Sequence, residues 1–196
     1  MFIDTGVLKT LPKEQVLSGM AEVIKYGLIR DRDFTDFLVS NKEAILSLQA
    51  DAVGEMVLTC CKIKADVVAE DERESDTRRI LNYGHTIGHA VEAASEFKLF
   101  HGLAVAIGMI AAARISLNKG MLSQGKYKEI FDIIKSYGLP TEVPEHLDRK
   151  VISSYLLTDK KNVAGKIFFI LPREDGTVEI TSDVSDEEIS AVISMS

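Results

Sequence analysis

The sequence predicts a mainly helical domain with one small β-hairpin, and three observations support this prediction. From residue 13 to about residue 157, apolar residues recur at the three- and four-residue spacing of amphipathic helices. Two short β-rich runs stand near residues 166–181, and no GxGxxG fingerprint follows a strand, so a complete dinucleotide-binding half is not expected. With 196 residues, 46% of them hydrophobic, the chain can bury a substantial core as a single domain over residues 1–196.

The first half of the chain predicts a series of helices. Residues 1–12 look extended or looped and end at Pro12, which opens a helix whose apolar residues form one stripe. Glu22 lies beside this stripe, and Lys25, three residues on, points to a neighbouring part of the same face. Further helices are expected at residues 31–40, from the cap Asn41 through Leu48, and at residues 51–70, and the charged run 71–79 predicts a surface turn.

The second half predicts a buried helix, further helices and the hairpin. The stretch GLAVAIGMIAAA, Gly102–Ala113, is shorter than the roughly 20 residues of a membrane span, so we expect a core helix. After it we expect a loop flanked by Gly120 and Gly125, a helix ended by Gly138 and Pro140, a helix from Glu145 to Leu157, a hairpin turn at Asp175 and Gly176, and a short closing helix capped by Ser185 or Asp186.

Charge and cysteine content narrow the class of function. The formal net charge of −7 argues against broad nucleic-acid binding, because such binding needs a basic face. It still allows a small anionic substrate in a locally basic pocket. Cys60 and Cys61 are adjacent, so we interpret them as reduced. We expect no secretory leader, because the N-terminal residues lack a basic segment followed by an apolar one. We therefore expect a cytoplasmic protein that binds neither nucleic acid nor membrane.

Three of the four histidines lie in LNYGHTIGHAVEAASEFKLFHG, residues 81–102, and each adjoins a glycine. His85 and His89 are four residues apart, so on a helix their rings share one face. Glu22 carries a charge at the edge of an apolar stripe, where a metal ion would give it a partner. Two imidazoles and one carboxylate are a common catalytic set around a divalent ion. The spacing leaves open which two of His85, His89 and His101 bind, and packing or proton-handling histidines are the alternatives.

Several cations are candidates for binding an anionic substrate. They are Lys25, Lys64, Arg78, Lys160 and Lys161, and for any single lysine a solvated helix face is the competing explanation. Arg78 precedes the histidine segment and can reach into it. Asn82 lies one turn before His85.

The segments FIDTGVLKTLP, AEVIKYGLI, KADVVAEDERESDTRRILNYGHTIGHAVE and FHGLAVAIGM, in this order, closely resemble the 3-dehydroquinate synthase family. The resemblance runs from about residue 2 to residue 172 and covers the larger, C-terminal part of those enzymes. With Arg78 and Asn82, LNYGHTIGHA is more similar to this family than to its aminocyclitol-forming relatives. The resemblance implies the multi-helix C-terminal domain of the dehydroquinate synthase-like fold.

The resemblance also implies the site residues. The metal ligands would be Glu22, His85 and His101, with zinc as the metal and cobalt as a substitute, while His89 would stay off the metal and handle protons. The substrate contacts would be Lys25, Lys64, Arg78, Asn82, His89 and Lys160, with Glu74 in the same polar network and Lys161 outside it. Val7, Leu8, Lys9 and Thr10 would contact NAD.

The reaction that the resemblance implies is the conversion of 3-deoxy-D-arabino-heptulosonate 7-phosphate to 3-dehydroquinate and phosphate, in the shikimate pathway to chorismate and the aromatic amino acids. Hydride moves to NAD and returns, phosphate leaves by elimination, and an intramolecular aldol step closes the carbocycle. The family suggests a homodimer. Because the family's N-terminal NAD-binding domain is missing from this sequence, we expect a domain fragment that is inactive alone.

Other interpretations remain alongside this one. An iron-type alcohol or polyol dehydrogenase would use simple hydride transfer and would not need the lysine and arginine cluster. Another sugar phosphate cyclase is a second possibility. A non-enzymatic helical interaction module, with satisfied core histidines, would bind no metal.

Overall fold

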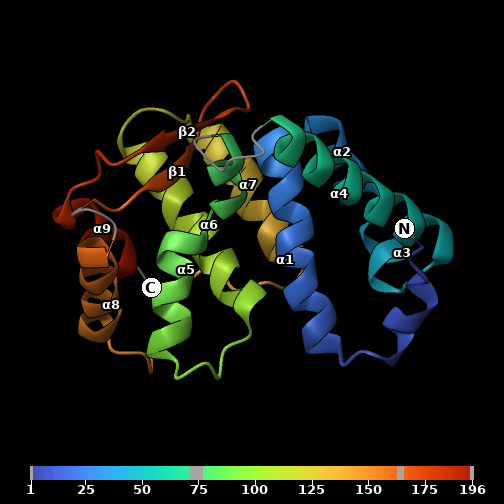
Figure 1. The fold of residues 1–196 in the computed structure, drawn as a ribbon, viewed down its shortest axis with the longest axis horizontal. Coiled ribbons are helices and arrows are strands. Elements are labelled where there is room, and N and C mark those ends of the chain that lie inside the picture. The colour runs from blue at the N-terminus through green and yellow to red at the C-terminus, as the bar shows by residue number, and fades with distance from the viewer. Residues whose placement is uncertain (1, 71–76, 163–165, 195–196) are drawn as a thin grey trace.

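Helix α6, His101–Asn118, lies at the centre of the fold (Figure 1). The computed structural model describes residues 2–70, 77–162 and 166–194. By length and composition α6 could cross a membrane, but 72% of it is buried against the rest of the chain. This burial identifies it as the helix around which the domain packs, and it confirms the core helix expected at Gly102–Ala113.

The N-terminal elements pack on one side of α6, through α1 (Lys13–Arg30). Helix α1 also contacts α2 (Arg32–Ser40) and α4 (Ala50–Glu70), and α4 contacts the short α3 (Lys42–Leu46). These helices confirm the expected boundaries closely. Each of these helices forms because its apolar residues repeat with the helical period and so share one buried face.

Two details of this half differ from expectation. Residues 1–12 are not simply extended, because Thr5–Thr10 form a 3₁₀ helix, η1, whose cap Asp4 accepts a hydrogen bond from the Gly6 amide at 2.8 Å. Asn41 precedes α3 but makes no side-chain cap bond to it. Its Nδ2 donates instead to the Phe37 carbonyl at 3.0 Å, so it closes α2.

The histidine segment follows a 3₁₀ helix, η2 (Thr77–Asn82), and begins α5 (His85–Ala94). Between them, Gly84 has φ 81°, a left-handed conformation that suits glycine. Helices α5 and α6 cross with their backbones in close contact. A Cβ at Gly108 would lie 1.9 Å from the Gly84 carbonyl oxygen, so this crossing requires glycine.

The C-terminal elements pack against the remaining surfaces of α5 and α6. They are α7 (Gln124–Ser136), α8 (Arg149–Asn162), the antiparallel strands β1 (Phe169–Pro172) and β2 (Val178–Thr181), and α9 (Asp186–Ser194). Figure 1 shows the hairpin above α9 and near η2, and β1 and β2 both contact η2. The predicted hairpin is confirmed, with Gly176 at φ 83° in its turn.

Three boundaries in this half are corrected or resolved. Gly125 lies inside α7, because Ser123 caps that helix by accepting from the Lys126 amide at 3.1 Å. Helix α8 begins at Arg149 and not at Glu145, since the Arg149 guanidinium binds backbone carbonyls of the preceding segment. Ser185, and not Asp186, caps α9: its Oγ accepts from the Glu188 amide and the Glu188 carboxylate accepts from the Ser185 amide.

Candidate metal centre

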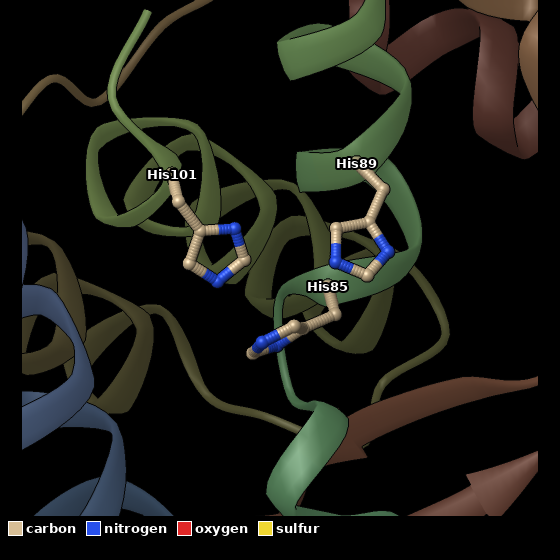
Figure 2. A group of neighbouring side chains, drawn as sticks. All are labelled: His85, His89 and His101. Carbon is tan, nitrogen blue, oxygen red and sulfur yellow. The ribbon is translucent and has the colours of Figure 1, made fainter. Parts of the chain in front are cut away.

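Three helices bring Glu22, His85 and His101 together. His85 is the first residue of α5, His101 is the first residue of α6, and Glu22 lies within α1. Glu22 Oε1 lies 3.6 Å from His85 Nε2 and 3.7 Å from His101 Nε2. Figure 2 shows the rings of His85, His89 and His101 gathered around a common space. Their ligand nitrogens all lie within 4.8 Å of one another.

The carboxylate oxygen in this cluster lacks a partner. Glu22 Oε1 is buried and accepts no hydrogen bond from the residues that the structure describes. A buried, unpaired carboxylate oxygen is costly unless something compensates its charge. Zinc bonds to nitrogen and oxygen of about 2.0–2.2 Å, in tetrahedral geometry, would separate ligand atoms by about 3.4 Å. The observed 3.6 and 3.7 Å separations therefore fit one divalent ion between these groups.

Hydrogen bonds on the far side of both rings set the tautomers. His85 Nδ1 lies 3.2 Å from the Tyr83 carbonyl oxygen, and His101 Nδ1 lies 3.0 Å from Glu92 Oε2. A carbonyl or an ionised carboxylate only accepts, so each Nδ1 carries the proton. Both Nε2 lone pairs then face Glu22. This is the usual arrangement behind a metal-bound histidine.

The environment keeps His85 neutral. The pKa of His85 is lowered to about 4, first by burial and then by the charge of Lys25, against the opposing effects of Glu22 and the Tyr83 carbonyl. The imidazole is therefore uncharged near neutral pH. The neutral ring is the form that binds a metal ion.

Lys25 pairs directly with the carboxylate of the cluster. Its side chain is only 4% exposed, and its Nζ donates to Glu22 Oε2 at 2.6 Å. Burial lowers the pKa of Lys25, the ion pair with Glu22 opposes this, and the positive charge of Lys64 lowers it again. One Glu22 oxygen thus pairs with Lys25, which leaves Oε1 to face the two imidazoles.

The other predicted residues lie at varying distances from this point. His89 is exposed one turn after His85, Lys64 is exposed on α4, and Arg78 and Asn82 lie on η2, the first half-buried and the second exposed. On η1, Val7, Lys9 and Thr10 are exposed and Leu8 is half-buried. Lys160 and Lys161 lie in the last turn of α8, but their side chains fall outside the part of the chain that the structure describes, and so does Glu74.

Glu92 is a site residue that the sequence reasoning missed. It lies seven residues after His85 on α5, two helical turns along the same face, so helical spacing alone could have flagged it. The Tyr83 carbonyl could not have been found this way, because a backbone contact leaves no side-chain signal.

The fold and the cluster together define a class: a helical domain that aims one carboxylate and two imidazoles at a single point. The model of the family "3-dehydroquinate synthase C-terminal" matches residues 19–162. The chain belongs to the 3-dehydroquinate synthase family and corresponds to its C-terminal domain.

Curated relatives support this assignment over the whole chain. The 3-dehydroquinate synthase of Desulforamulus reducens is 49% identical over 99% of this chain. That of Thermodesulfovibrio yellowstonii is 41% identical over 98%. In both cases the match covers 54% of the relative, so the chain spans about half the length of the curated relatives it matches.

Solved structures of related cyclases share the fold. A structure of 2-epi-5-epi-valiolone synthase from Streptomyces hygroscopicus, with NAD+ and Zn2+ bound, matches 97% of this chain and 53% of its own, at 25% identity and a TM-score of 0.87. A 2-deoxy-scyllo-inosose synthase complexed with carbaglucose-6-phosphate, NAD+ and Co2+ matches 97% of this chain and 55% of its own, at 28% identity and a TM-score of 0.81.

Proposed function

We propose that this chain forms the metal- and substrate-binding part of a 3-dehydroquinate synthase, which converts 3-deoxy-D-arabino-heptulosonate 7-phosphate to 3-dehydroquinate and phosphate. The observation that carries the proposal is the unpaired Glu22 Oε1 facing two Nε2 atoms. The 49% identity to a 3-dehydroquinate synthase, against 25% and 28% to cyclases with other products, supports this reaction over that of another sugar phosphate cyclase.

In this proposal Glu22, His85 and His101 hold zinc or cobalt. A bound ion would polarise the substrate hydroxyl that is oxidised and the carbonyl that it becomes. Lys25 offsets the second Glu22 oxygen, so the carboxylate stays ionised and positioned. His89, exposed one turn from His85, is placed to accept or return a proton at the substrate.

The remaining cations of the proposal bind the anionic parts of the substrate. Arg78 and Lys160 would hold the carboxylate and the departing phosphate, because charge-assisted hydrogen bonds to such groups are strong. Lys64 would add to the same positive field, since its charge already acts on Lys25. Asn82 would bind a hydroxyl.

NAD binding is proposed to need a second domain. The curated relatives are about twice as long, and the exposed Val7, Lys9 and Thr10 offer only one edge of a cofactor site, with Leu8 partly buried behind them. The full reaction is therefore proposed for this chain joined to a nucleotide-binding domain, and the chain alone is proposed to be inactive.

We further propose a cytoplasmic homodimer. Cys60 and Cys61 are unpaired in the structure, in keeping with a reducing compartment.

Metal analysis tests the core of the proposal. The purified chain is expected to hold one zinc per molecule, and Glu22→Gln to lose most of it, because an amide is a poor ligand for zinc. Glu14→Gln is the matched control, since Glu14 lies exposed on the same helix. Equal zinc in both variants would refute the assignment.

A fusion experiment tests the reaction. The chain is joined to the N-terminal half of the Desulforamulus reducens relative and supplied with the heptulosonate phosphate. We expect phosphate release that requires His85 and His101. Alcohol-dependent NADH formation without phosphate release would indicate an iron-type dehydrogenase instead.

A further inference from the structure

A cavity of about 210 Å³ lies on the side of α5 that faces away from His85 and His89. Ile87 on α5 lines it, and at about 100° per residue Ile87 points away from both His85 and His89. The cavity is therefore separate from the candidate metal centre. Its other walls come from α6, α7, α9 and the segment 141–143.

Part of the cavity wall is apolar, because several helices turn apolar side chains toward it. Ile107 and Ile110 come from α6, Phe131 from α7 and Val192 from α9. Such a lining favours the apolar body of a ligand. The volume limits that body to a small molecule, about the size of a single aromatic ring with a short chain.

One cation enters this apolar space. Arg114 is the one lysine or arginine on α6, and it is half-buried. Its guanidinium lies 4.2 Å from the centre of the Tyr127 ring, and its Nη2 donates to the Tyr127 hydroxyl at 2.9 Å. Within the described residues it forms no ion pair, although Glu142 also lines the cavity. An arginine has five N–H donors, so most of them stay available.

The positions of these groups set the chemistry of a ligand. The contacts with the ring and the hydroxyl of Tyr127 hold the guanidinium in place, and the planar fork of an arginine matches a carboxylate. An apolar part of the wall beside one cation favours an anion that carries an apolar body. Glu142 is exposed and Thr141 is half-buried, so the cavity also offers a polar side where an ammonium group of the ligand can lie.

We propose that this cavity is a binding site for a small carboxylate with an apolar body, whose carboxylate pairs with Arg114 while its body packs against Ile87, Ile110 and Phe131. The ligand is either a simple aryl- or alkyl-carboxylate or an apolar α-amino acid. Both share the carboxylate and the apolar body. They differ in whether an ammonium group is present to meet Glu142.

Titration of the 196-residue chain with 3-phenylpropionate tests the proposal, with the uncharged 3-phenylpropanol as the matched ligand. We expect saturable binding of the acid, seen as shifts of the Ile110 and Val192 methyl signals in NMR spectra, and weaker binding of the alcohol. Arg114→Met should weaken binding of the acid at least tenfold and leave the affinity for the alcohol unchanged, because only the acid interacts with the charge of Arg114. Arg32→Met, at an exposed arginine, should change neither.

A second variant keeps the test decisive if Arg114→Met does not fold. Ala111→Leu fills the cavity and keeps the guanidinium, so it should abolish binding of both ligands. L-Phenylalanine shows which kind of carboxylate the cavity binds. Binding that is tighter than that of phenylpropionate and is lost in Glu142→Gln supports an amino acid. Weaker binding supports a simple carboxylate. Equal affinity of acid and alcohol, or binding of the acid that survives both Arg114→Met and Ala111→Leu, would overturn the site.

Discussion

At the scale of single residues, Glu92 decides how His101 presents its free nitrogen. The carboxylate accepts a hydrogen bond from His101 Nδ1, with Oε2 3.0 Å from that nitrogen, and so leaves Nε2 to face Glu22 Oε1. A carboxylate behind a histidine ring also makes that ring a stronger ligand for a metal ion. His85 Nδ1 donates in the same way to the Tyr83 carbonyl, which carries no charge. A side-chain substitution can therefore test the support of only one of the two rings.

We expect Glu92→Ala to weaken zinc binding by about 10- to 100-fold, as loss of a carboxylate behind a metal-bound histidine typically does. Glu92→Gln should recover part of this loss, because the amide oxygen can still accept from Nδ1. Competition with a zinc-binding dye measures both. Glu96→Gln is the control, since that carboxylate pairs with Lys98 at the surface. A Glu92→Ala affinity like that of the control would show that Glu92 only packs.

The sequence located the candidate residues better than it assigned their roles. Helical spacing put His85 and His89 on one face and singled out Glu22, and these residues do lie around one point with His101. The division between ligands and neighbours came only from the family resemblance. Spacing could not supply it, because the division depends on how α1 and α6 approach α5, and that is set by long-range packing.

At the scale of elements, close approach of α5 and α6 fixes the separation of the two imidazoles. The glycines beside the histidines were expected to allow such approach. A Cβ at Gly88 would lie 3.0 Å from the Ala104 carbonyl oxygen, and one at Gly102 would lie 1.9 Å from the Ser18 carbonyl oxygen of α1. The backbone segments that these glycines approach, including the α6 segment at Gly108, could not be predicted from local sequence.

Gly108→Ala is expected to destabilise the chain by about 3 kcal/mol or more, because the added methyl meets the Gly84 carbonyl and the α5–α6 crossing must open. The midpoint of urea denaturation measures this. Gly54→Ala on α4 is the control: a Cβ there meets nothing within 4 Å, so it should stabilise by up to about 1 kcal/mol through helix propensity. Equal midpoints for the two variants would mean that the helices are not held in this contact.

At the scale of the whole molecule, the candidate centre ties together parts of the chain that are far apart in sequence. Glu22 comes from the N-terminal group of helices, whereas His85 and His101 begin the two central helices. An ion held by all three would link α1 to α5 and α6. It would bind the folded chain and not the separated ligands of the unfolded chain, so binding must add to stability.

Zinc is therefore expected to raise the melting temperature of the metal-free chain. At free zinc of 100 times the dissociation constant, linkage adds about 2.7 kcal/mol. For a domain of this size that is a rise of roughly 5–10 °C, because each kcal/mol shifts the midpoint by about 2–4 °C. Calorimetry with and without a chelator measures the shift. Glu22→Gln should fold but lose the response, since its amide leaves only the imidazoles facing the ion. An equal rise of the melting temperature in Glu22→Gln would mean that the stabilising zinc binds elsewhere. No rise in the parent chain would mean that Glu22, His85 and His101 do not bind the ion together.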